Sequence, residues 1–362
     1  MKKVLIATPL FPPSIGGPAT YVKLLSEELP KKGIEVSVVS FDLVRHLPKG
    51  IRHMVFFWRV LKEARKTGLV FAQDPVSVGL PSLFAAFISR RPFAAGVHGD
   101  YVWEQSRQRF GVVDSIDDFQ HKKYGFRVEV LRWVQKKVVR SAIFTITPSN
   151  YLRDIVRMWT REPERIVTTY FAADVSSIQK SPALWGNDRR QIFTAGRLVP
   201  WKGFSYLLDV LHSMPPLWHL LIVGDGPDRD VLEKKVAALG VADRVRFTGA
   251  ISHKELVRHM LESDLYILNS SFESFSFQTV EAMKAGLPVV ATTIGSFPEI
   301  VRHMVDGILV TPNDEEGIVD AVKQYEDGVF RQKMIKSAMS RAEYFSVDKT
   351  IDGLVKLIQK TI

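Results

Sequence analysis

Short runs of β-branched and aromatic residues alternate with helical patterns along almost the whole chain. The first run, Lys3–Thr8, is followed from about Pro18 by apolar residues at helical spacing, and then by Gly33 and a second run, Glu35–Ser40. A strand, a helix and a strand in this order form a parallel crossover, and repeated crossovers are typical of α/β folds. The pattern therefore predicts an α/β protein with parallel sheets.

The alternation starts twice, which indicates two halves of one architecture. Three further strands of the first half are expected within 69–73, 93–99 and 143–149, with an amphipathic helix at Phe126–Ser141. The second half contains six expected strands, each followed by a helix, within 191–203, 219–226, 244–250, 265–270, 288–292 and 307–311. Periodicity is lost over Thr168–Ser181, so we expect two doubly wound domains, 1–170 and 171–344.

The loop between the first strand and its helix is rich in proline and glycine. In open α/β sheets, ligands bind beyond the carboxyl ends of the strands, where this loop lies. Gly16 and Gly17 have no Cβ, so a ligand can approach their backbone, and a helix start offers N–H groups to a phosphate. Ordinary turn chemistry explains the same pair of glycines. The dinucleotide fingerprint G-x-G-x-x-G is absent, which argues against a dehydrogenase.

The first strand of the second half is followed by two cations, Arg197 and Lys202. Arginine offers a planar fork and lysine a point charge, a pair that suits a pyrophosphate, although surface bases on a solvated loop give the same pattern. Further along, Glu273 and Glu281 flank a helix start at about Ser276. Two carboxylates so placed can hold two groups of hydroxyls, as a sugar and a ribose present, while helix amides hold phosphates.

Taken together, these stretches resemble the family 4 retaining glycosyltransferases, which have the GT-B fold. The second half carries AGRLVPWKG, VGDGP, FTGAI, ESFSFQTVEAMKAGLPVVA, GSFPEIV and DGILVTPND. The opening IGGPATYVKLLSEELPKKGIEVSVVS is similar to the family's first crossover, and AEYFSVDKTIDGLVKLIQK resembles its carboxyl-terminal helix. The resemblance implies two Rossmann-like domains facing each other across a cleft. Residues 1–170 would bind the acceptor, residues 171–344 the nucleotide sugar, and the helix at 345–362 would cross back to the first domain.

The resemblance implies transfer of a sugar from a nucleotide diphosphate sugar to an acceptor, with retention at the anomeric carbon. Glu281 would hold the ribose hydroxyls, and Glu273 would hold the donor sugar and distal phosphate together with the backbone of Phe275, Ser276 and Phe277. Ser274 and Ser276 stand where the family commonly has glycine, so the fit of the sugar pocket stays open.

The resemblance further implies that Arg197 and Lys202 neutralise the pyrophosphate as the leaving group departs, and that backbone at Ala250 and Ile251 meets the base. In the first domain, Gly16 and Gly17 would close over the phosphates. His98, in GVHGD after a strand, would lie beside the transferred sugar, although a lone histidine there is usually structural. The candidate catalytic residues are His98, Glu273, Arg197 and Lys202.

This interpretation requires no metal ion and no cofactor besides the substrate, a UDP-, GDP- or ADP-sugar. The two cations and the helix amides place positive charge where the leaving diphosphate develops negative charge. Asp228 and Asp230 imitate the metal-binding Asp-x-Asp of the other glycosyltransferase fold. They lie in an expected first helical turn, where the helix dipole favours acidic residues in any case.

The charge of the chain is uneven, and it bears on the acceptor. The net charge is +10; residues 1–174 carry +11 and the rest carry −1. In the expected helix Ile51–Lys66, a wheel places Ile51, Met54, Val55, Trp58 and Leu61 on one side and Arg52, Arg59, Lys62 and Lys66 on the other. Such a helix suits an anionic membrane surface, but a packed crossover helix with a solvated basic face explains the same pattern. No nucleic-acid motif accompanies the pI of 9.6, so no nucleic acid is expected.

Three functions remain open at this point. The leading one is a glycosyltransferase acting on a lipid-linked or envelope glycan acceptor at the membrane surface. The second has a soluble acceptor, and the third is a GT-B epimerase or a non-catalytic sugar-nucleotide binder. The chain has no cysteine, and prolines at 9, 12 and 13 interrupt its first apolar run. We therefore expect a cytoplasmic protein without a signal peptide, with peripheral attachment to the inner face of the membrane as an open alternative.

Overall fold

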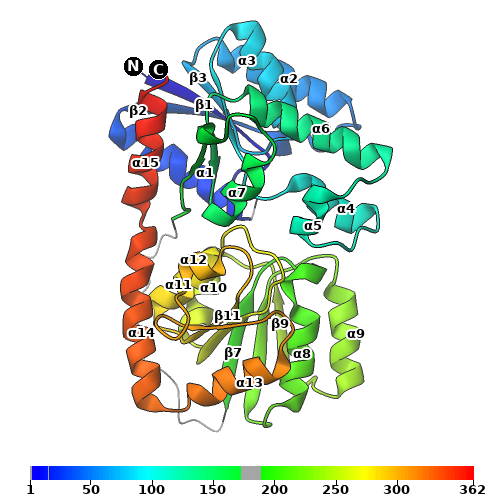
Figure 1. Ribbon diagram of the computed structural model, residues 1–362, viewed down its shortest axis with the longest axis vertical. Helices are drawn as coiled ribbons and strands as arrows, with labels where there is room; N and C mark the ends of the chain where they lie inside the picture. Colours follow the sequence, from blue (N-terminus) through cyan, green and yellow to red (C-terminus); the bar gives the residue numbers. More distant parts are fainter. Residues whose placement is uncertain (1, 15, 173–188) are drawn as a thin grey trace. The chain divides into compact units, whose positions relative to one another are not determined.

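A computed structural model describes residues 2–14, 16–172 and 189–362 (Figure 1). The chain divides into two compact units. The N-terminal unit comprises Met1–Phe171 and Asp348–Ile362, and the C-terminal unit comprises Ala172–Val347. Part of the expected boundary, 173–181, lies outside the described residues. The acceptor and donor roles of the two expected domains stay predictions.

The N-terminal unit is built on a parallel sheet with the strand order β2-β1-β3-β4-β5-β6. Its strands are β1 (Lys2–Thr8), β2 (Ile34–Ser40), β3 (Leu69–Ala72), β4 (Phe93–Gly96), β5 (Thr145–Thr147) and β6 (Ile166–Thr168). The five predicted strands are present. The prediction missed β6, because three residues are too few to show an alternation.

The helices of the N-terminal unit connect these strands. They are α1 (Gly17–Glu28), α2 (Ile51–Ala64), α3 (Gly79–Ser89), α4 (Tyr101–Arg109), α5 (Ile116–His121), α6 (Phe126–Ser141) and α7 (Asn150–Arg157). All four residues at the centre of β1, Val4–Ala7, are fully buried. Both faces of this strand are therefore covered, as is typical of parallel sheets.

The carboxyl-terminal helix α15 (Val347–Gln359) returns to the N-terminal unit, as predicted. The hydroxyl of Thr350 donates to the carbonyl of Tyr170 over 2.7 Å, and Lys32 pairs with Asp352 over 2.8 Å. Figure 1 shows this red helix beside α1 and β2. These contacts join residues that precede the C-terminal unit in the sequence to residues that follow it, and all of them belong to the N-terminal unit.

The C-terminal unit repeats the architecture with the parallel order β12-β11-β10-β7-β8-β9. Its strands are β7 (Arg190–Ala195), β8 (Trp218–Val223), β9 (Val245–Gly249), β10 (Leu265–Leu268), β11 (Val289–Thr292) and β12 (Ile308–Val310). Its helices are α8 (Phe204–Ser213), α9 (Arg229–Leu239), α10 (His253–Leu261), α11 (Phe277–Ala285), α12 (Phe297–Ile300), α13 (Glu315–Gln324) and α14 (Gly328–Ala342). All six predicted strands are present, each followed by a helix, so the predicted α/β fold is confirmed.

The faces of α2 differ from the predicted ones. The core takes Phe56, Val60, Leu61 and Ala64, whereas Ile51, Met54 and Trp58 are exposed. The wheel grouped these three exposed residues with Leu61 as one apolar face, and that grouping is wrong. Apolar residues occupy more than one side of this helix, so periodicity alone does not identify the side that packs on the sheet.

The loop after β7 passes very close to the end of β10. Gly203 has a φ of +69°, and a Cβ on it would lie 2.0 Å from the carbonyl oxygen of Asn269. Gly224, after β8, is equally crowded, because its Cβ would lie 2.0 Å from the carbonyl oxygen of Gly196. Only glycine allows these backbone contacts, which draw together the loops that follow β7, β8 and β10.

We expect Gly203→Ala to lower the free energy of unfolding by more than about 3 kcal/mol, because it adds a backbone clash to left-handed strain. Gly240→Ala is the matched control. Gly240 has a φ of +66° with nothing within 4 Å of its Cβ position, so only strain of about 1 kcal/mol is expected there. Urea unfolding of the two variants measures the difference. Equal losses would show that the close approach at Gly203 has no energetic weight.

Candidate functional site

The predicted donor residues of the C-terminal unit lie at the carboxyl ends of its strands. Arg197 and Lys202 follow β7, Ala250 and Ile251 follow β9, and Glu273 follows β10. β7 and β10 are neighbours in the sheet, and the chain proceeds from them in opposite directions, to β8 and to β11. Such a switch point is where open α/β sheets bind ligands.

Lys202 and Glu273 form an ion pair at this switch point. Lys202 ends the short turn η4 (Pro200–Lys202), and its Nζ contacts Oε2 of Glu273. The two side chains are only 14% and 10% exposed. Burial raises the pKa of the Glu273 carboxyl, and the charge of Lys202 opposes that shift. The structure thus brings together two residues that are far apart in the sequence. The charge of each compensates the buried charge of the other.

The backbone of Glu273 is fixed by the loop after β11. The N–H of Ser296 donates to the carbonyl of Glu273 over 3.0 Å. Gly295 has a φ of +67°, and its Cβ would lie 2.4 Å from the same carbonyl oxygen. The glycine of the GSFPEIV stretch therefore has a packing role, which holds the carboxylate in place.

Ser276 caps α11. Its Oγ accepts a hydrogen bond from the N–H of Thr279 over 3.3 Å and lies 2.8 Å from the hydroxyl of Thr279. The side chain is buried. Serine is a favourable residue at this position, because it satisfies an otherwise free amide of the first turn. The side chain of Ser276 therefore lies inside the helix cap, while Ser274 is half-buried.

Glu281, in α11, has a partner that sequence reasoning missed. Nε2 of His253 lies 2.7 Å from Oε1 of Glu281, whose side chain is only 6% exposed. His253 begins α10, two residues after Ile251. Its place just beyond a residue expected to meet the base is the only signal that pointed to it. The pairing puts Glu281 and the β9–α10 connection, where Ala250 is exposed, at one place.

Arg197 is exposed, and within the described ranges it has no hydrogen-bond or ion-pair partner. Phe275 is buried, with its ring 5.6 Å from that of Phe277 and 5.7 Å from that of Phe345. The side chain of Phe275 therefore supports the loop from inside, and only its backbone is left to meet a ligand.

In the N-terminal unit, His98 follows β4 and packs in an aromatic cluster. Its Nε2 lies 2.8 Å from Oε1 of Gln73, so the amide carbonyl accepts the imidazole hydrogen. The rings of Tyr21 and Phe171 lie 5.4 Å and 4.9 Å from the imidazole. Burial lowers the pKa of His98 from 6.5 to about 3. His98 is therefore neutral at pH 7 and serves as a hydrogen-bonding group.

Three buried polar atoms of this cluster lack a hydrogen-bond partner in the part of the chain that the structure describes. They are the hydroxyl of Tyr21, Nε2 of Gln73 and Nδ1 of His98. Buried polar groups are rarely left unsatisfied, so these three atoms remain available to a further hydrogen-bond partner. Sequence reasoning missed Tyr21 and Gln73. Gln73 directly follows β3, the neighbour of β4, and that position was the available signal.

The predicted glycines of the N-terminal unit lie at the same edge of the sheet. Gly16 precedes α1 with a φ of +150°, and Gly17 is the first residue of that helix. β1 pairs with β3, and β3 pairs with β4. The helix start after β1 and the His98 cluster therefore belong to adjacent strand ends.

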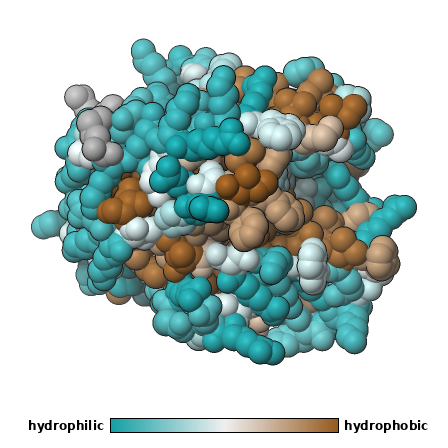
Figure 2. Space-filling view, turned by 90° about the horizontal axis from the view of Figure 1, so that it is seen from above, coloured by the Kyte–Doolittle hydropathy of each residue, from teal (hydrophilic) through white to brown (hydrophobic). Residues whose placement is uncertain are grey.

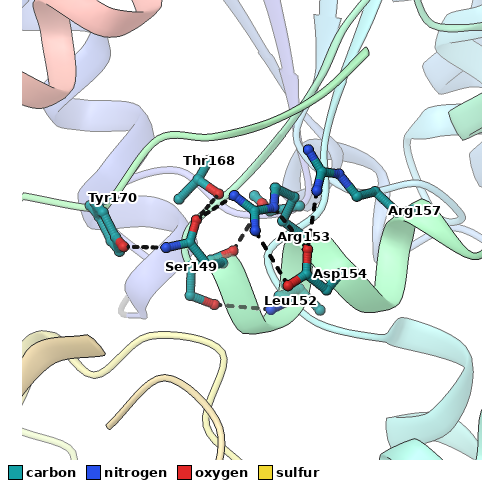
Figure 3. Close-up of polar contacts among 9 residues, drawn as sticks. Ser149, Leu152, Arg153, Asp154, Arg157, Thr168 and Tyr170 are labelled. Atoms are coloured by element: carbon teal, nitrogen blue, oxygen red, sulfur yellow. Dashed lines mark hydrogen bonds and ion pairs between the residues drawn. The ribbon is translucent and has the colours of Figure 1, made fainter. Parts of the chain in front are cut away.

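A polar network holds the segment that leads to Phe171 (Figure 3). The side-chain Nδ2 of Asn150 donates to the hydroxyl of Tyr170 over 2.7 Å, while the side chains of Thr168 and Arg153 donate to Oδ1 of Asn150 over 2.8 Å and 2.7 Å. Because Thr350 also holds the carbonyl of Tyr170, both sides of this residue are fixed. The network thereby sets the position of Phe171 against His98.

Over residues 2–14, 16–172 and 189–362, no three His, Asp or Glu side chains gather as metal ligands do. Asp228 precedes α9, and Asp230 lies in its first turn. Among these same residues, every helix is too short or too polar to cross a bilayer.

Comparison with known families identifies the class of protein. Residues 15–177 match the family Glycosyltransferase Family 4, and residues 176–341 match Glycosyl transferases group 1. The two matches follow one another along almost the whole chain. The chain belongs to the family 4 glycosyltransferases, as the resemblance indicated.

Individual relatives are more distant. The chain is 34% identical over 158 residues to an uncharacterized glycosyltransferase of Methanocaldococcus jannaschii, covering 42% of this chain and 40% of that protein. It spans 58% and 35% of the next two curated relatives. It is 22% identical to the N-acetyl-alpha-D-glucosaminyl L-malate synthase of Bacillus anthracis over 94% of this chain and 92% of that one. It is also 26% identical to the GDP-mannose-dependent alpha-(1-6)-phosphatidylinositol monomannoside mannosyltransferase of Mycolicibacterium smegmatis over 88% of both.

Solved structures share the fold. HepE of Anabaena, crystallised with UDP and glucose, superimposes with a TM-score of 0.80 over 99% of this chain and all of that chain, at 21% identity. The GT-B assignment is thereby confirmed. The roles of the individual site residues stay predictions.

We expect Glu281→Ala to weaken the binding of a nucleoside diphosphate about 10- to 150-fold, because a charged acceptor of ribose hydroxyls is lost. Titration calorimetry with UDP, GDP and ADP measures the change. Glu262→Ala removes an exposed carboxylate of the same unit and is the matched control. Unchanged affinity in Glu281→Ala would contradict the ribose assignment.

His98 should also make stability depend on pH. The pKa of His98 is about 3 in the folded protein, against an ordinary 6.5. Between these two pH values, the imidazole is protonated in the unfolded chain but not in the folded protein. Its stabilising effect is complete above pH 6.5 and is lost as the pH falls toward 3. Relative to His98→Asn, the wild type should lose up to about 1.4 kcal/mol more per pH unit in this window. Urea unfolding between pH 7 and pH 4 tests this, with the exposed His46→Asn as the control. Parallel curves for wild type and His98→Asn would refute it.

Proposed function

We propose that the protein transfers a sugar from a UDP-, GDP- or ADP-sugar to a lipid-linked or envelope glycan acceptor at the membrane surface. The transfer retains the anomeric configuration and needs no metal ion. Membership of family 4 supports the reaction class. The observation that carries the donor assignment is the buried pair of Lys202 and Glu273 at the switch point of the C-terminal sheet.

The donor would lie along the carboxyl edge of the C-terminal sheet. Glu281 accepts hydrogen bonds from the ribose hydroxyls, and the 2.7 Å contact with His253 positions its carboxylate. Glu273 accepts hydroxyls of the sugar. Lys202 and the exposed Arg197 supply two positive charges for the diphosphate, and the free amides at the start of α11 add donors.

The chemistry follows from where the charge develops. As the bond between the anomeric carbon and the diphosphate breaks, the leaving group takes the electron pair. Arg197 and Lys202 stabilise that charge, which is the contribution a divalent cation otherwise makes. An acceptor hydroxyl then bonds to the anomeric carbon on the same face, and its proton passes to an oxygen of the departing diphosphate. His98, neutral at pH 7, would hydrogen-bond the sugar through its free Nδ1.

The acceptor assignment is supported by charge. The whole positive excess of the chain lies in residues 1–174, and phospholipid glycosylation appears in the name of one relative, the mannosyltransferase of Mycolicibacterium smegmatis. A soluble acceptor is the second candidate, because the N-acetyl-alpha-D-glucosaminyl L-malate synthase of Bacillus anthracis, whose name contains a small acid, matches along almost the full chain.

The test is a panel of UDP-, GDP- and ADP-sugars, with nucleotide release measured first with water and then with lipid extracts or soluble sugars and hydroxy acids. We expect one donor to be used, activity to survive excess EDTA, and NMR of the product to show the donor's anomeric configuration. Recovery of activity only with magnesium or manganese would overturn metal independence. A product that is an isomer of the donor sugar would identify an epimerase, and binding without turnover would identify a non-catalytic binder.

The same assay tests the two cations. Arg197→Ala and Lys202→Ala should each lower turnover about 100-fold or more, as does the loss of a group that stabilises a developing negative charge. Lys234→Ala, at an exposed position of α9, is the control. Because Lys202→Ala leaves Glu273 buried without a counter-charge, a melting curve must accompany it. Full turnover in a folded Arg197→Ala and Lys202→Ala would refute the assignment.

A further inference from the structure

An apolar groove runs between α2, α3 and α6 of the N-terminal unit. Its volume is about 550 Å³, within the range of small-molecule sites. The lining includes His53 and Phe57 of α2, Leu80, Phe84 and Ile88 of α3, and Leu131 of α6. Burial and the neighbouring Arg52 lower the pKa of His53, so this histidine is uncharged at pH 7. The groove is thus an apolar surface without a fixed charge.

Other large apolar side chains of the same three helices face solvent. Phe87 of α3 and Phe126 of α6 are 80% and 83% exposed, and Trp58 of α2 and Trp133 of α6 are more than half exposed. Figure 2, which views the molecule from above relative to Figure 1, shows hydrophobic side chains gathered on this face. A monomeric soluble protein rarely exposes such a continuous patch, which therefore marks a contact with something apolar.

Helices α2 and α6, and the residues that directly follow α2 and α3, are strongly basic. Residues 51–66, 79–91 and 126–141 contain 12 Lys and Arg but only two carboxylates, Glu63 and Glu129. Arg59, Lys62 and Arg127 are among the exposed ones. The occupant of this face therefore has to be apolar and negatively charged at once.

An anionic bilayer meets both requirements. Its headgroups attract exposed cations, its hydrocarbon accepts the phenylalanines, and tryptophan is favoured at the boundary between the two. A second copy of this chain is disfavoured, because a symmetric contact would place two such basic surfaces against each other. A free apolar ligand would leave the cations without a counterpart.

We propose that α2, α3 and α6 form a membrane-docking face whose groove takes up a hydrocarbon chain of an anionic bilayer lipid. This inference rests on the proposed function and deepens it, because it places the binding of a lipid in a particular groove. It uses no residue of the C-terminal unit. Failure of lipid binding would therefore leave nucleotide-sugar binding and turnover intact, and failure of turnover would leave vesicle binding intact.

The first test is co-sedimentation of the full chain with vesicles of equal parts phosphatidylcholine and phosphatidylglycerol, and with pure phosphatidylcholine. We expect binding to the anionic vesicles at about 0.1 M salt and much less at about 1 M salt. Arg59→Gln/Lys62→Gln/Arg127→Gln should lower the low-salt affinity about 100-fold, from about fivefold per cation. No binding of the folded wild type at low salt would overturn the proposal.

The apolar part is tested with Phe84→Ser/Ile88→Ser. This variant should lower vesicle affinity about tenfold or more at both salt concentrations, because screening does not weaken the burial of apolar surface. Val113→Ser, 81% exposed but outside the three helices, is the matched control. Phe84 and Ile88 are themselves more than half exposed, so melting curves should change little. An equal loss in Val113→Ser, or none in the double variant, would overturn the role of the groove.

Uptake of a chain is tested by fluorescence. In a Trp58→Phe/Trp133→Phe background, Phe57→Trp places an indole in the groove, and phosphatidylglycerol brominated at mid-chain should quench it more than lipid brominated near the headgroup. Quenching near the headgroup only would mean surface adsorption without uptake. Sedimentation velocity without lipid supplies the last check. A wild-type dimer that Phe84→Ser/Ile88→Ser converts to a monomer would assign the face to a second copy and overturn the proposal.

Discussion

The close contact between Gly203 and the carbonyl of Asn269 sets the geometry of the C-terminal site. With no room for a Cβ, the turn after β7 lies directly on the end of β10, and Lys202 is carried to Glu273. Gly295 packs closely against the carbonyl oxygen of Glu273. The two charges are thereby removed from water, where each depends on the other. The packing of these uncharged glycines therefore determines where the two charges of the site lie.

The N-terminal unit uses a different device at the same edge of its sheet. Its cluster is built from neutral groups, and it leaves hydrogen-bonding atoms of Tyr21, Gln73 and His98 unused. A low dielectric makes such atoms costly to leave alone and effective once a partner arrives. The C-terminal edge therefore offers charged groups, whereas the N-terminal edge offers neutral hydrogen-bonding groups.

The sequence predicted the strands and most connections, because buried parallel strands appear as continuous β-branched runs and the helices as periodic ones. It also predicted that Arg197, Lys202 and Glu273 lie at the carboxyl ends of strands and that Glu281 lies in the following helix, and the structure has them there; their roles stay predictions. His253 and Gln73 were out of reach, because their importance comes from partners 28 and 25 residues away.

Two errors have simple physical origins. Three-residue β6 is too short to alternate, and α2 has apolar residues on more than one side, so its wheel grouped Trp58 with the buried Leu61. The wheel therefore did not separate the exposed Trp58 from the buried Leu61. Ser276 stands where the family commonly has glycine, and its side chain caps α11.

The return of α15 has a consequence for the order in which the protein is made. Ile351, Leu354 and Ile358 are buried in the N-terminal unit, so that unit lacks part of its core until residues 348–362 have left the ribosome. The C-terminal unit, encoded in the middle, has all its residues earlier. Although domains generally fold from the amino terminus onward during synthesis, here the unit that emerges first is completed last. Until then it leaves exposed the surface that Ile351, Leu354 and Ile358 cover in the folded protein.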